Sequence, residues 1–376
     1  MIPTPEQKLL LRACLWSGAD ARAAWSAWRA RAVFEQLDAG SFRLLPLLHE
    51  NLRREKIDDA WLGRMKGVQR QAWSRNQLLF HEAAPVLSAM QDAAISVLVL
   101  KGATLANHFY AEPGLRPMGD FDFMVPLAQT DCAFEIMRQC GWKHVQVVPL
   151  AQEVWCSHAS KWENQNGRQM DLHWHLLPGW RQPGADDEVW SRASAVAVAG
   201  KNFPAMSATD LLWHVCAHGA IGDDVPSIRW VADAWMILQQ TRDPVDWEKF
   251  LASVQQRQLG FCVGGALRCL HGEFNAPIPA RVLEILNRVP PSWLERWEQR
   301  IVSGPPGVTG MLPLHCVNYL RLMRGQSFGA KISGLPFFFQ RTAGVASAWK
   351  LPGHYFSRLA ARLVPRKKIG KAVGQV

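Results

Sequence analysis

Residues 115–125 read Leu-Arg-Pro-Met-Gly-Asp-Phe-Asp-Phe-Met-Val, and they are the most informative feature of the chain. Asp120 and Asp122 stand one residue apart in a run that is otherwise apolar. Since side chains alternate along a β-strand, both carboxylates leave the same face and can share one polyvalent cation. Phe121 and Phe123 then point to the opposite face, toward a core. Aspartate is depleted in strands, and a buried carboxylate without a partner is costly, so the pair indicates a divalent metal site.

A third carboxylate follows in a second apolar strand candidate. Asp171 opens the run Met-Asp-Leu-His-Trp-His-Leu-Leu over residues 170–177. Three carboxylates on neighbouring strands can hold the two cations of an in-line phosphoryl or nucleotidyl transfer, roughly 3.5–4 Å apart. An Asp-x-Asp pair by itself also occurs in solvated turns, so the surrounding sequence has to decide between the two interpretations.

The sequence before the pair favours the metal site. Residues 95–110 are typical of a buried strand, a tight Lys-Gly turn and a short helix. Gly102 lets the backbone come close to a ligand, amides at the helix start face an anion, and Lys101 adds a positive charge. In the next loop, Arg116 offers a fork of donors for phosphate oxygens, and Gly119 allows close approach.

This order of elements resembles the nucleotidyltransferases of the DNA polymerase beta superfamily. The wording "LKGATLANHFYAEPGLRPMGDFDFMV" followed by "MDLHWHL" is similar to one bacterial branch, the uncharacterised nucleotidyltransferase family, over roughly residues 80–240. The resemblance implies that Asp120 and Asp122 form the metal-binding pair and that Asp171 is the carboxylate acting on the acceptor hydroxyl. It also implies two Mg²⁺ ions, or Mn²⁺, and a nucleoside triphosphate substrate, with ATP favoured.

Two features depart from the wider superfamily. Lys101-Gly102-Ala103 stands where other members have Gly-Ser, so a serine contact to the terminal phosphates is missing. The spacing from Gly102 to Asp120 is also longer than in the minimal members. The resemblance therefore leaves the triphosphate to Lys101, Gly102, Arg116 and Gly119.

The function implied is transfer of a nucleoside monophosphate to a hydroxyl of a small molecule, peptide or protein, with release of pyrophosphate. Relatives in the branch belong with polysaccharide or peptide natural-product pathways. A kinase-like phosphotransferase would use the same site but release a nucleoside diphosphate, and a non-catalytic binding or scaffold protein would release neither. A nucleic-acid acceptor ranks lower, because the sequence has no evident extended basic groove.

Three residues after the predicted sheet and one within it are candidates for the cleft. His214 and His218 are four apart and share a helix face, which suits zinc, the lining of the active cleft, or ordinary packing. Arg229 and Asp233 have the spacing of an intrahelical ion pair, and Arg229 can alternatively contact the nucleotide. His173, two residues beyond the third aspartate, is a further cleft candidate.

Composition indicates a globular protein: 376 residues with 48% hydrophobic content can bury a sizeable core. Eight cysteines show no Cys-x-x-Cys pattern and follow no secretory leader, which predicts reduced thiols and a cytoplasmic location. Nowhere do about 18 apolar residues follow one another without interruption, so the sequence predicts no membrane span.

The net charge of +10 falls largely in the tail. Its first part has the pattern of an amphipathic helix that Pro365 would end, and it can rest on an anionic membrane or RNA, or remain a solvated terminus. The short apolar run 335–339 can pack under a domain or touch a lipid surface. The basic residues of the tail are Arg358, Arg362, Arg366, Lys367, Lys368 and Lys371.

The sequence thus predicts an α+β fold, in which a small mixed-sheet nucleotidyltransferase core is flanked by helical regions. The expected parts are an N-terminal helical region 1–90, the core 91–204, a helical domain 205–345 and the basic tail 346–376. Within the core we expect a helix near 127–140 and strands at 95–100, 121–125, 142–148, 153–163 and 170–177.

Overall fold

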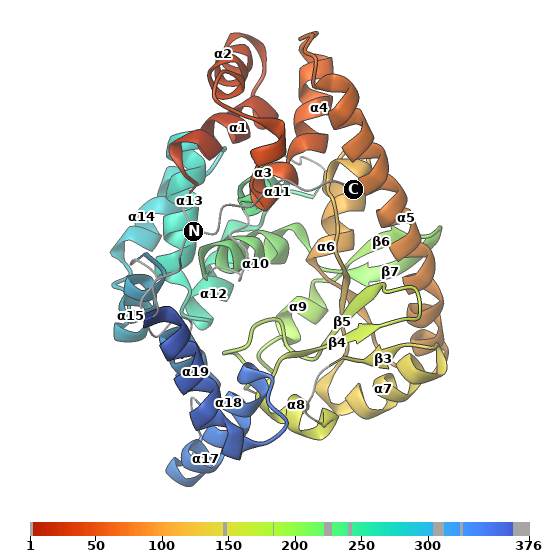
Figure 1. The fold of residues 1–376 in the computed structure, drawn as a ribbon, viewed down its shortest axis with the longest axis vertical. Coiled ribbons are helices and arrows are strands. Elements are labelled where there is room, and N and C mark those ends of the chain that lie inside the picture. Colours follow the sequence, from red (N-terminus) through yellow and green to blue (C-terminus); the bar gives the residue numbers. More distant parts are fainter. Residues whose placement is uncertain are drawn as a thin grey trace.

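Seven strands form one mixed sheet at the centre of the protein (Figure 1). The structure is a computed structural model that describes residues 3–145, 149–182, 184–221, 228–239, 243–303, 312–323 and 326–363. The strand order across the sheet is β3-β4-β5-β2-β1-β7-β6. The strands are β1 (Leu98–Val99), β2 (Phe121–Met124), β3 (Lys143–His144), β4 (Ala159–Glu163), β5 (Gln169–His173), β6 (Ser194–Val198) and β7 (Lys201–Ala205).

Two strand pairs in this sheet are parallel and the others are antiparallel. β2 runs parallel to β5, and β1 runs parallel to β7. β1 and β2 are antiparallel neighbours, as are β3 and β4, β4 and β5, and β6 and β7. With helices on both flanks, this arrangement confirms the predicted α+β class.

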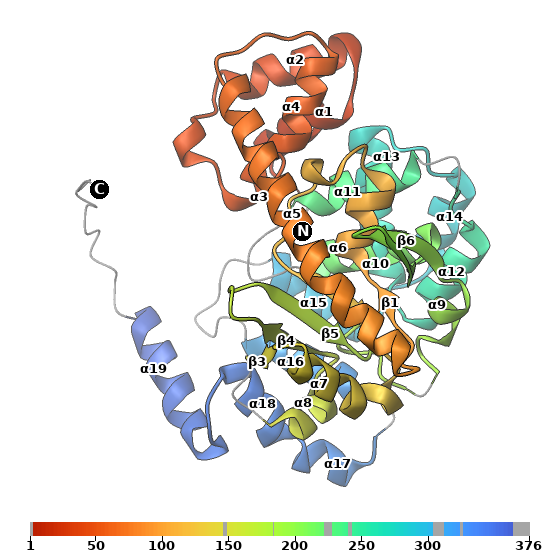
Figure 2. The ribbon, with the colours of Figure 1, turned by 90° about the vertical axis from the view of Figure 1, so that its right-hand side faces the viewer.

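Helices precede the sheet and also interrupt it. The longest, α5, has 31 residues and crosses the face of the sheet (Figure 2). The helices up to β7 are α1 (Pro5–Leu15), α2 (Gly18–Arg29), α3 (Ala39–Phe42), α4 (Leu45–Arg54), α5 (Leu62–Asp92), α6 (Lys101–Thr104), α7 (Thr130–Gln139), α8 (Leu150–Cys156) and α9 (Asp187–Ser191), with single helical turns η1 (Phe34–Gln36), η2 (Leu105–Phe109), η3 (Pro113–Leu115) and η4 (Leu127–Gln129).

After β7, the regular elements that the structure describes are all helices. These helices are α10 (Ala208–Ile221), α11 (Arg229–Leu238), α12 (Trp247–Gln256), α13 (Gly260–Phe274), α14 (Ala280–Arg288), α15 (Trp293–Ser303), α16 (Leu312–Leu322), α17 (Phe328–Ser333), α18 (Leu335–Ala343) and α19 (Leu351–Leu363), with the turn η5 (Ala348–Lys350) before α19. No described helix is long and apolar enough to cross a membrane.

The alternation of side chains along β2 divides the core in two. Phe121 and Phe123 are fully buried among residues of α5 and α7, which lie on one side of the sheet (Figure 1). Met124 points the other way, into a larger cluster that includes α10, α11 and α13. The two phenylalanines therefore face a core, as the sequence predicted, and the aspartate between them leaves the opposite face.

The first helices share that larger core with helices near residue 270. Leu10 and Leu11 are fully buried in the same cluster as Leu270. At its edge, Lys8 Nζ lies 2.6 Å from Glu273 Oε1, and Arg12 Nη2 lies 2.9 Å from Glu273 Oε2. The N-terminal helices thus pack against the C-terminal helices, and the four-part division of the chain stays a prediction.

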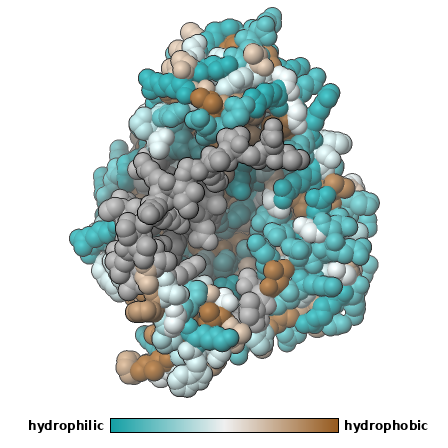
Figure 3. All heavy atoms as spheres, in the orientation of Figure 1, coloured by the Kyte–Doolittle hydropathy of each residue, from teal (hydrophilic) through white to brown (hydrophobic). Residues whose placement is uncertain are grey.

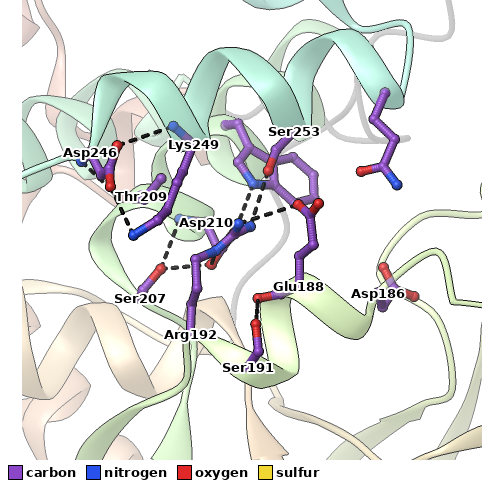
Figure 4. A network of polar contacts seen from close by, with 12 residues as sticks. Asp186, Glu188, Ser191, Arg192, Ser207, Thr209, Asp210, Asp246, Lys249 and Ser253 are labelled. Atoms are coloured by element: carbon purple, nitrogen blue, oxygen red, sulfur yellow. Dashed lines mark hydrogen bonds and ion pairs between the residues drawn. The ribbon is translucent and has the colours of Figure 1, made fainter.

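A polar network joins the start of β6 to the helices that follow the sheet (Figure 4). The Arg192 guanidinium donates to both oxygens of Asp210, at 2.6 and 3.0 Å, and to Ser253 Oγ at 3.0 Å. Ser207 Oγ accepts from the backbone N–H of Asp210, which caps the start of α10. The network fixes α10, which carries His214 and His218, relative to the sheet.

Three of the predicted strands differ from the structure. The strand predicted at 95–100 is reduced to β1, Leu98–Val99. The strand predicted at 153–163 begins only at Ala159, because residues 153–156 belong to α8. There Glu153 turns inward and forms an ion pair with Arg341, 3.2 Å away. The strand predicted at 170–177 ends at His173. The strand predicted at 142–148 contains β3, and residues 146–148 lie outside the described residues.

The hairpin of β6 and β7 was not predicted. Alanine has low strand propensity, so the run Ser-Ala-Val-Ala-Val gives a weak signal. The turn uses Ala199 at φ 48° and Gly200 at φ 81°, and only the second of these is a residue that favours this conformation.

The contact between α10 and α11 gives a stability prediction. A Cβ at Gly219 would overlap the Trp230 indole, so we expect Gly219→Ala to lower the free energy of unfolding by about 1–3 kcal/mol. The matched control is Gly67→Ala at an exposed position of α5, where a Cβ meets nothing within 4 Å, and it should raise that free energy by about 0.5–1 kcal/mol. Urea denaturation measures both, and equal effects of the two variants would contradict this packing.

Candidate functional site

The parallel pairing of β2 with β5 brings two of the three predicted aspartates together. Asp122 lies directly opposite Asp171 in the strand register. His173 follows on the same face of β5, and its Nε2 lies 3.4 Å from Asp122 Oδ1. One ligand atom from each of Asp122, Asp171 and His173 lies within 4.8 Å of the other two. The strands thus converge three ligand-type side chains on one point.

The donor atoms of this group suit a divalent cation. Asp171 Oδ1 and His173 Nδ1 are buried and have no hydrogen-bond partner among the described residues. Buried polar atoms are seldom left without a partner, and such exceptions often mark an absent ion. Carboxylate oxygens are the ligands that Mg²⁺ and Mn²⁺ prefer. The residues present therefore fit the metal that the sequence predicted.

Asp120 precedes β2 and stands beside this group without belonging to it. The negative charge of Asp122, followed by burial, raises the pKa of Asp120. Burial, followed by the charges of Asp122 and Asp120, raises the pKa of Asp171 to about 7. The three aspartates repel one another, and a bound cation would relieve that repulsion.

Asp122 behaves differently because cationic groups face it. Burial opposes its ionisation, but the charge of Lys101, together with the neighbouring His173, lowers its pKa below the usual range. The carboxylate of Asp122 is therefore ionised at neutral pH and forms the fixed negative centre of the site.

Lys101, at the start of α6, is held by a histidine on α10. Its Nζ lies 2.9 Å from Nε2 of His218. The charge of Lys101 and burial lower the pKa of His218 well below its usual value, so the neutral imidazole accepts a hydrogen bond from the ammonium. His214, one turn earlier, is buried, and burial and Lys101 lower its pKa to about 3. Both cleft candidates on α10 thus lie near the aspartates.

The zinc interpretation of this histidine pair finds no support among the described residues. The group of three potential metal ligands found among these residues is Asp122, Asp171 and His173, and it includes neither His214 nor His218.

The two predicted glycines play different parts. A Cβ at Gly102 would sit 3.4 Å from Asp122 Oδ2 and 3.3 Å from Met118 Cε, so the backbone of α6 packs closely against the carboxylate. At Gly119 a Cβ would meet nothing within 4 Å, which leaves the approach to Asp120 open.

Arg116 is buried and its guanidinium is engaged inside the protein. Nε and Nη2 donate to the two oxygens of Asp233, at 2.8 and 2.9 Å, and Nη1 donates to the carbonyl of Gly102 at 3.2 Å. Tyr110 also donates to Asp233, and Arg229 lies 3.8 Å from it as the predicted intrahelical pair. Arg116 thus ties the loop before β2 to α6 and α11, and its predicted phosphate contact would require this network to rearrange.

The loop before β2 has a second anchor that sequence reasoning missed. Asn76 of α5 is fully buried, and its Nδ2 donates to the carbonyls of Pro113 and Arg116 at 2.7 and 2.9 Å. Its Oδ1 accepts from the backbone N–H of Met118 at 3.0 Å. The available signal was an asparagine among the apolar positions of a helix. Its partners lie about 40 positions away, so no local pattern identifies them.

Three cationic or ionisable side chains near the site were also missed. Lys161 of β4 is the cross-strand neighbour of Asp171, on the same face. The His158 ring lies 5.3 Å from the His173 ring. Arg75 of α5 donates to the carbonyl of Gly119 at 3.2 Å. A lysine alternating with apolar residues in residues 159–163 was the available signal for the first, once the register was known.

The match to a protein family agrees with the sequence motifs. Residues 39–275 match the sequence profile of the family described as uncharacterised nucleotidyltransferase. No curated protein matches the chain. Among solved structures, a lincomycin-bound lincosamide antibiotic adenylyltransferase is 14% identical, with 43% of this chain and 97% of that chain covered and a TM-score of 0.30. An antigenic nucleotidyltransferase-like protein from Paracoccidioides brasiliensis is 12% identical, with coverages of 56% and 95% and a TM-score of 0.32.

The buried ion pair below the site gives a second stability prediction. Asp233→Asn leaves the charge of Arg116 buried without its counter-ion, and we expect the free energy of unfolding to fall by about 3–5 kcal/mol. Tyr110→Phe removes only one hydrogen bond to the same carboxylate and should cost about 1 kcal/mol. Denaturant titration of both variants tests the ranking, which a larger loss in the tyrosine variant would contradict.

Repulsion among the aspartates predicts opposite effects of one substitution with and without metal. In EDTA, Asp171→Asn should melt at or above the wild-type temperature, because it removes a carboxylate whose ionisation is disfavoured. With Mg²⁺ or Mn²⁺ at about 100 times the dissociation constant, the wild type should gain about 2.7 kcal/mol and the variant much less. Thermal melting measures both arms. Equal stabilisation of the two proteins by metal would show that the ion binds elsewhere.

Proposed function

Because the chain belongs to the family of uncharacterised nucleotidyltransferases, we propose that it moves a nucleoside monophosphate from a nucleoside triphosphate to a hydroxyl group and releases pyrophosphate. ATP is the proposed donor. The acceptor is a small molecule, a peptide or a protein side chain. The reaction takes place at the end of β2 and β5, in the cytoplasm.

The observation that carries this proposal is the register of Asp122 with Asp171. It sets two carboxylates from different strands side by side, with one buried oxygen of Asp171 unpaired among the described residues. A structural ion pair would have satisfied that oxygen with a nearby cation. A site for a divalent ion and a phosphate-bearing substrate accounts for it instead.

Asp120, Asp122 and Asp171 would hold the Mg²⁺ ions, with His173 close to the same position. When bound, the metal ions lower the pKa of the acceptor hydroxyl and neutralise charge on the phosphates. Asp120 is in place to reach the nucleotide from the open side of the loop, because Gly119 leaves that approach free.

In the transfer step, the acceptor oxygen attacks the α-phosphorus and forms the new phosphorus–oxygen bond. The bond from that phosphorus to the bridging oxygen breaks, and pyrophosphate leaves with the bonding electrons. Asp171 Oδ1 is the proposed acceptor of the hydroxyl proton, because this atom has no other partner among the described residues.

Lys101 is the proposed contact for the leaving phosphates. Its ammonium lies among the site residues, and His218 holds it there as a neutral acceptor. A lysine whose position is set in advance loses little on binding an anion. His218 is thus a positioning residue, and Arg116 acts in the same way by holding the loop between α6 and β2.

Removing one site carboxylate tests the proposal. We expect Asp120→Asn to weaken Mg²⁺-dependent binding of a non-hydrolysable ATP analogue by at least about tenfold, because the aspartate charge that would bind metal is lost with little change in volume. Isothermal titration with Mg²⁺ and with EDTA measures this. The matched control is Asp131→Asn at an exposed position of α7, which makes the same charge change away from the site.

The outcome also separates the alternatives. Metal-dependent binding that only the site variant loses supports a working transferase, and once an acceptor is found the by-product decides the reaction. Pyrophosphate marks nucleotidyl transfer and nucleoside diphosphate marks a kinase. If the folded wild type binds no nucleotide, even with acceptor candidates present, the transferase proposal fails and the protein is a binding or scaffold protein.

A further inference from the structure

All of the excess positive charge of this protein follows Glu298. Residues 299–376 contain 12 lysines and arginines and no aspartate or glutamate. The remainder of the chain holds the other 30 of 42 basic residues and all 32 acidic ones, so it is close to neutral. Arg321 and Arg341 pair with Glu298 and Glu153, and the other ten basic residues lie in a segment that has no acidic residue of its own. This segment therefore has an anionic partner of large extent as its natural counterpart.

The helices of the same segment have one buried face and one exposed face. Phe338 and Phe339 of α18 are buried against Tyr319 of α16, with ring centroids 5.1 and 6.3 Å from the tyrosine ring. Leu335 and Phe337 of the same helix are exposed. The core that α18 needs is thus complete without these two side chains, which point away from it.

The exposed apolar side chains are continuous with others nearby. The Phe337 ring lies 6.5 Å from the exposed Trp155 ring of α8, which covers Gly334 so closely that a Cβ there would overlap it. On α17, Phe328 and Ile332 are four residues apart on one face and are 78% and 58% exposed. We call these five residues the apolar tip: Trp155, Phe328, Ile332, Leu335 and Phe337. Brown side chains mark the lower end of the molecule over α17 in Figure 3.

Basic and aromatic residues adjoin the tip in the sequence. Lys331 is exposed between Phe328 and Ile332. In the turn η5, Trp349 is 93% exposed beside the exposed Lys350, and Phe356 of α19 is 73% exposed. Large aromatic side chains interspersed with lysine and arginine are the composition of surfaces that lie in the interface of a lipid bilayer.

We propose that this protein docks peripherally on an anionic lipid bilayer through the apolar tip and the basic segment that follows it. The apolar side chains enter the boundary between headgroups and acyl chains, and the lysines and arginines meet the anionic headgroups. Ile332 and Leu335 favour this partner over RNA, because aliphatic side chains gain from lipid but offer no stacking surface for bases. The inference is independent of the reaction at the aspartates.

Vesicle flotation of the full chain tests the proposal. The probes are vesicles of phosphatidylcholine alone and of phosphatidylcholine with phosphatidylserine. We expect binding to the anionic vesicles only, falling as salt is raised. The tail variant Arg366→Gln/Lys367→Gln/Lys368→Gln should lower the partition coefficient by at least about tenfold, since each basic residue near the surface contributes roughly fivefold.

Two surface variants separate the apolar part from the charge. Phe328→Ser/Ile332→Ser should also lower the partition coefficient about tenfold. The matched control Val33→Ser/Leu78→Ser removes two exposed apolar side chains elsewhere and should bind as the wild type does. Circular dichroism and thermal melting check that each variant is folded, and the single variant Phe328→Ser, at the most exposed position of the tip, serves if the double variant is not.

Four results would overturn the proposal. The first is the absence of flotation with anionic vesicles, and the second is equal flotation with neutral ones. The third is binding of single-stranded RNA that the tail variant loses while the wild type floats with no vesicle, which would assign the basic segment to nucleic acid. Unchanged flotation of the tip variant would exclude the tip and with it the proposed surface.

Discussion

The parallel pairing of β2 with β5 is the constraint on which the rest of the site depends. It sets Asp122 opposite Asp171 and carries His173 to the same face, although 44 residues of chain, 125–168, separate the two strands. The chain between them forms α7, β3, α8 and β4, and β4 places Lys161 as the cross-strand neighbour of Asp171. Hydrogen bonds of the sheet thus hold like charges together that would separate in solution, and the stability of the two cores supplies the free energy for this.

Sequence alone predicted the part of this arrangement that has a local pattern. The alternation of Asp120, Phe121, Asp122 and Phe123 fixed which face is polar, and the order of strand, glycine turn and helix placed Lys101 and Gly102 near the aspartates. The mixed sheet with helices on both flanks followed from the same motifs. These features persist because each depends on residues that are neighbours along the chain.

What the sequence could not supply was pairing between distant positions. Arg116 has the side chain of a phosphate ligand, but its partner Asp233 lies on a helix more than 100 residues later, and only the fold shows that they meet. His218 likewise reaches Lys101 from a helix 117 positions later in the sequence. The prediction of a strand at 153–156 was wrong for the same reason. Glu153 is buried against Arg341, a partner far away in the sequence, and a local pattern treats such a charged residue as exposed.

The clamp made by Asn76 sets a lower limit on the piece of chain that can keep the site. The loop leading to Asp120 is held from α5, outside the part of the sequence that contains the strands and the aspartates. A fragment cut to the sheet alone would retain every predicted ligand and still lose the support that aims them. In evolutionary terms, a long helix that reads as an accessory region is inseparable from the chemistry, so the two must be inherited, expressed and engineered as one unit.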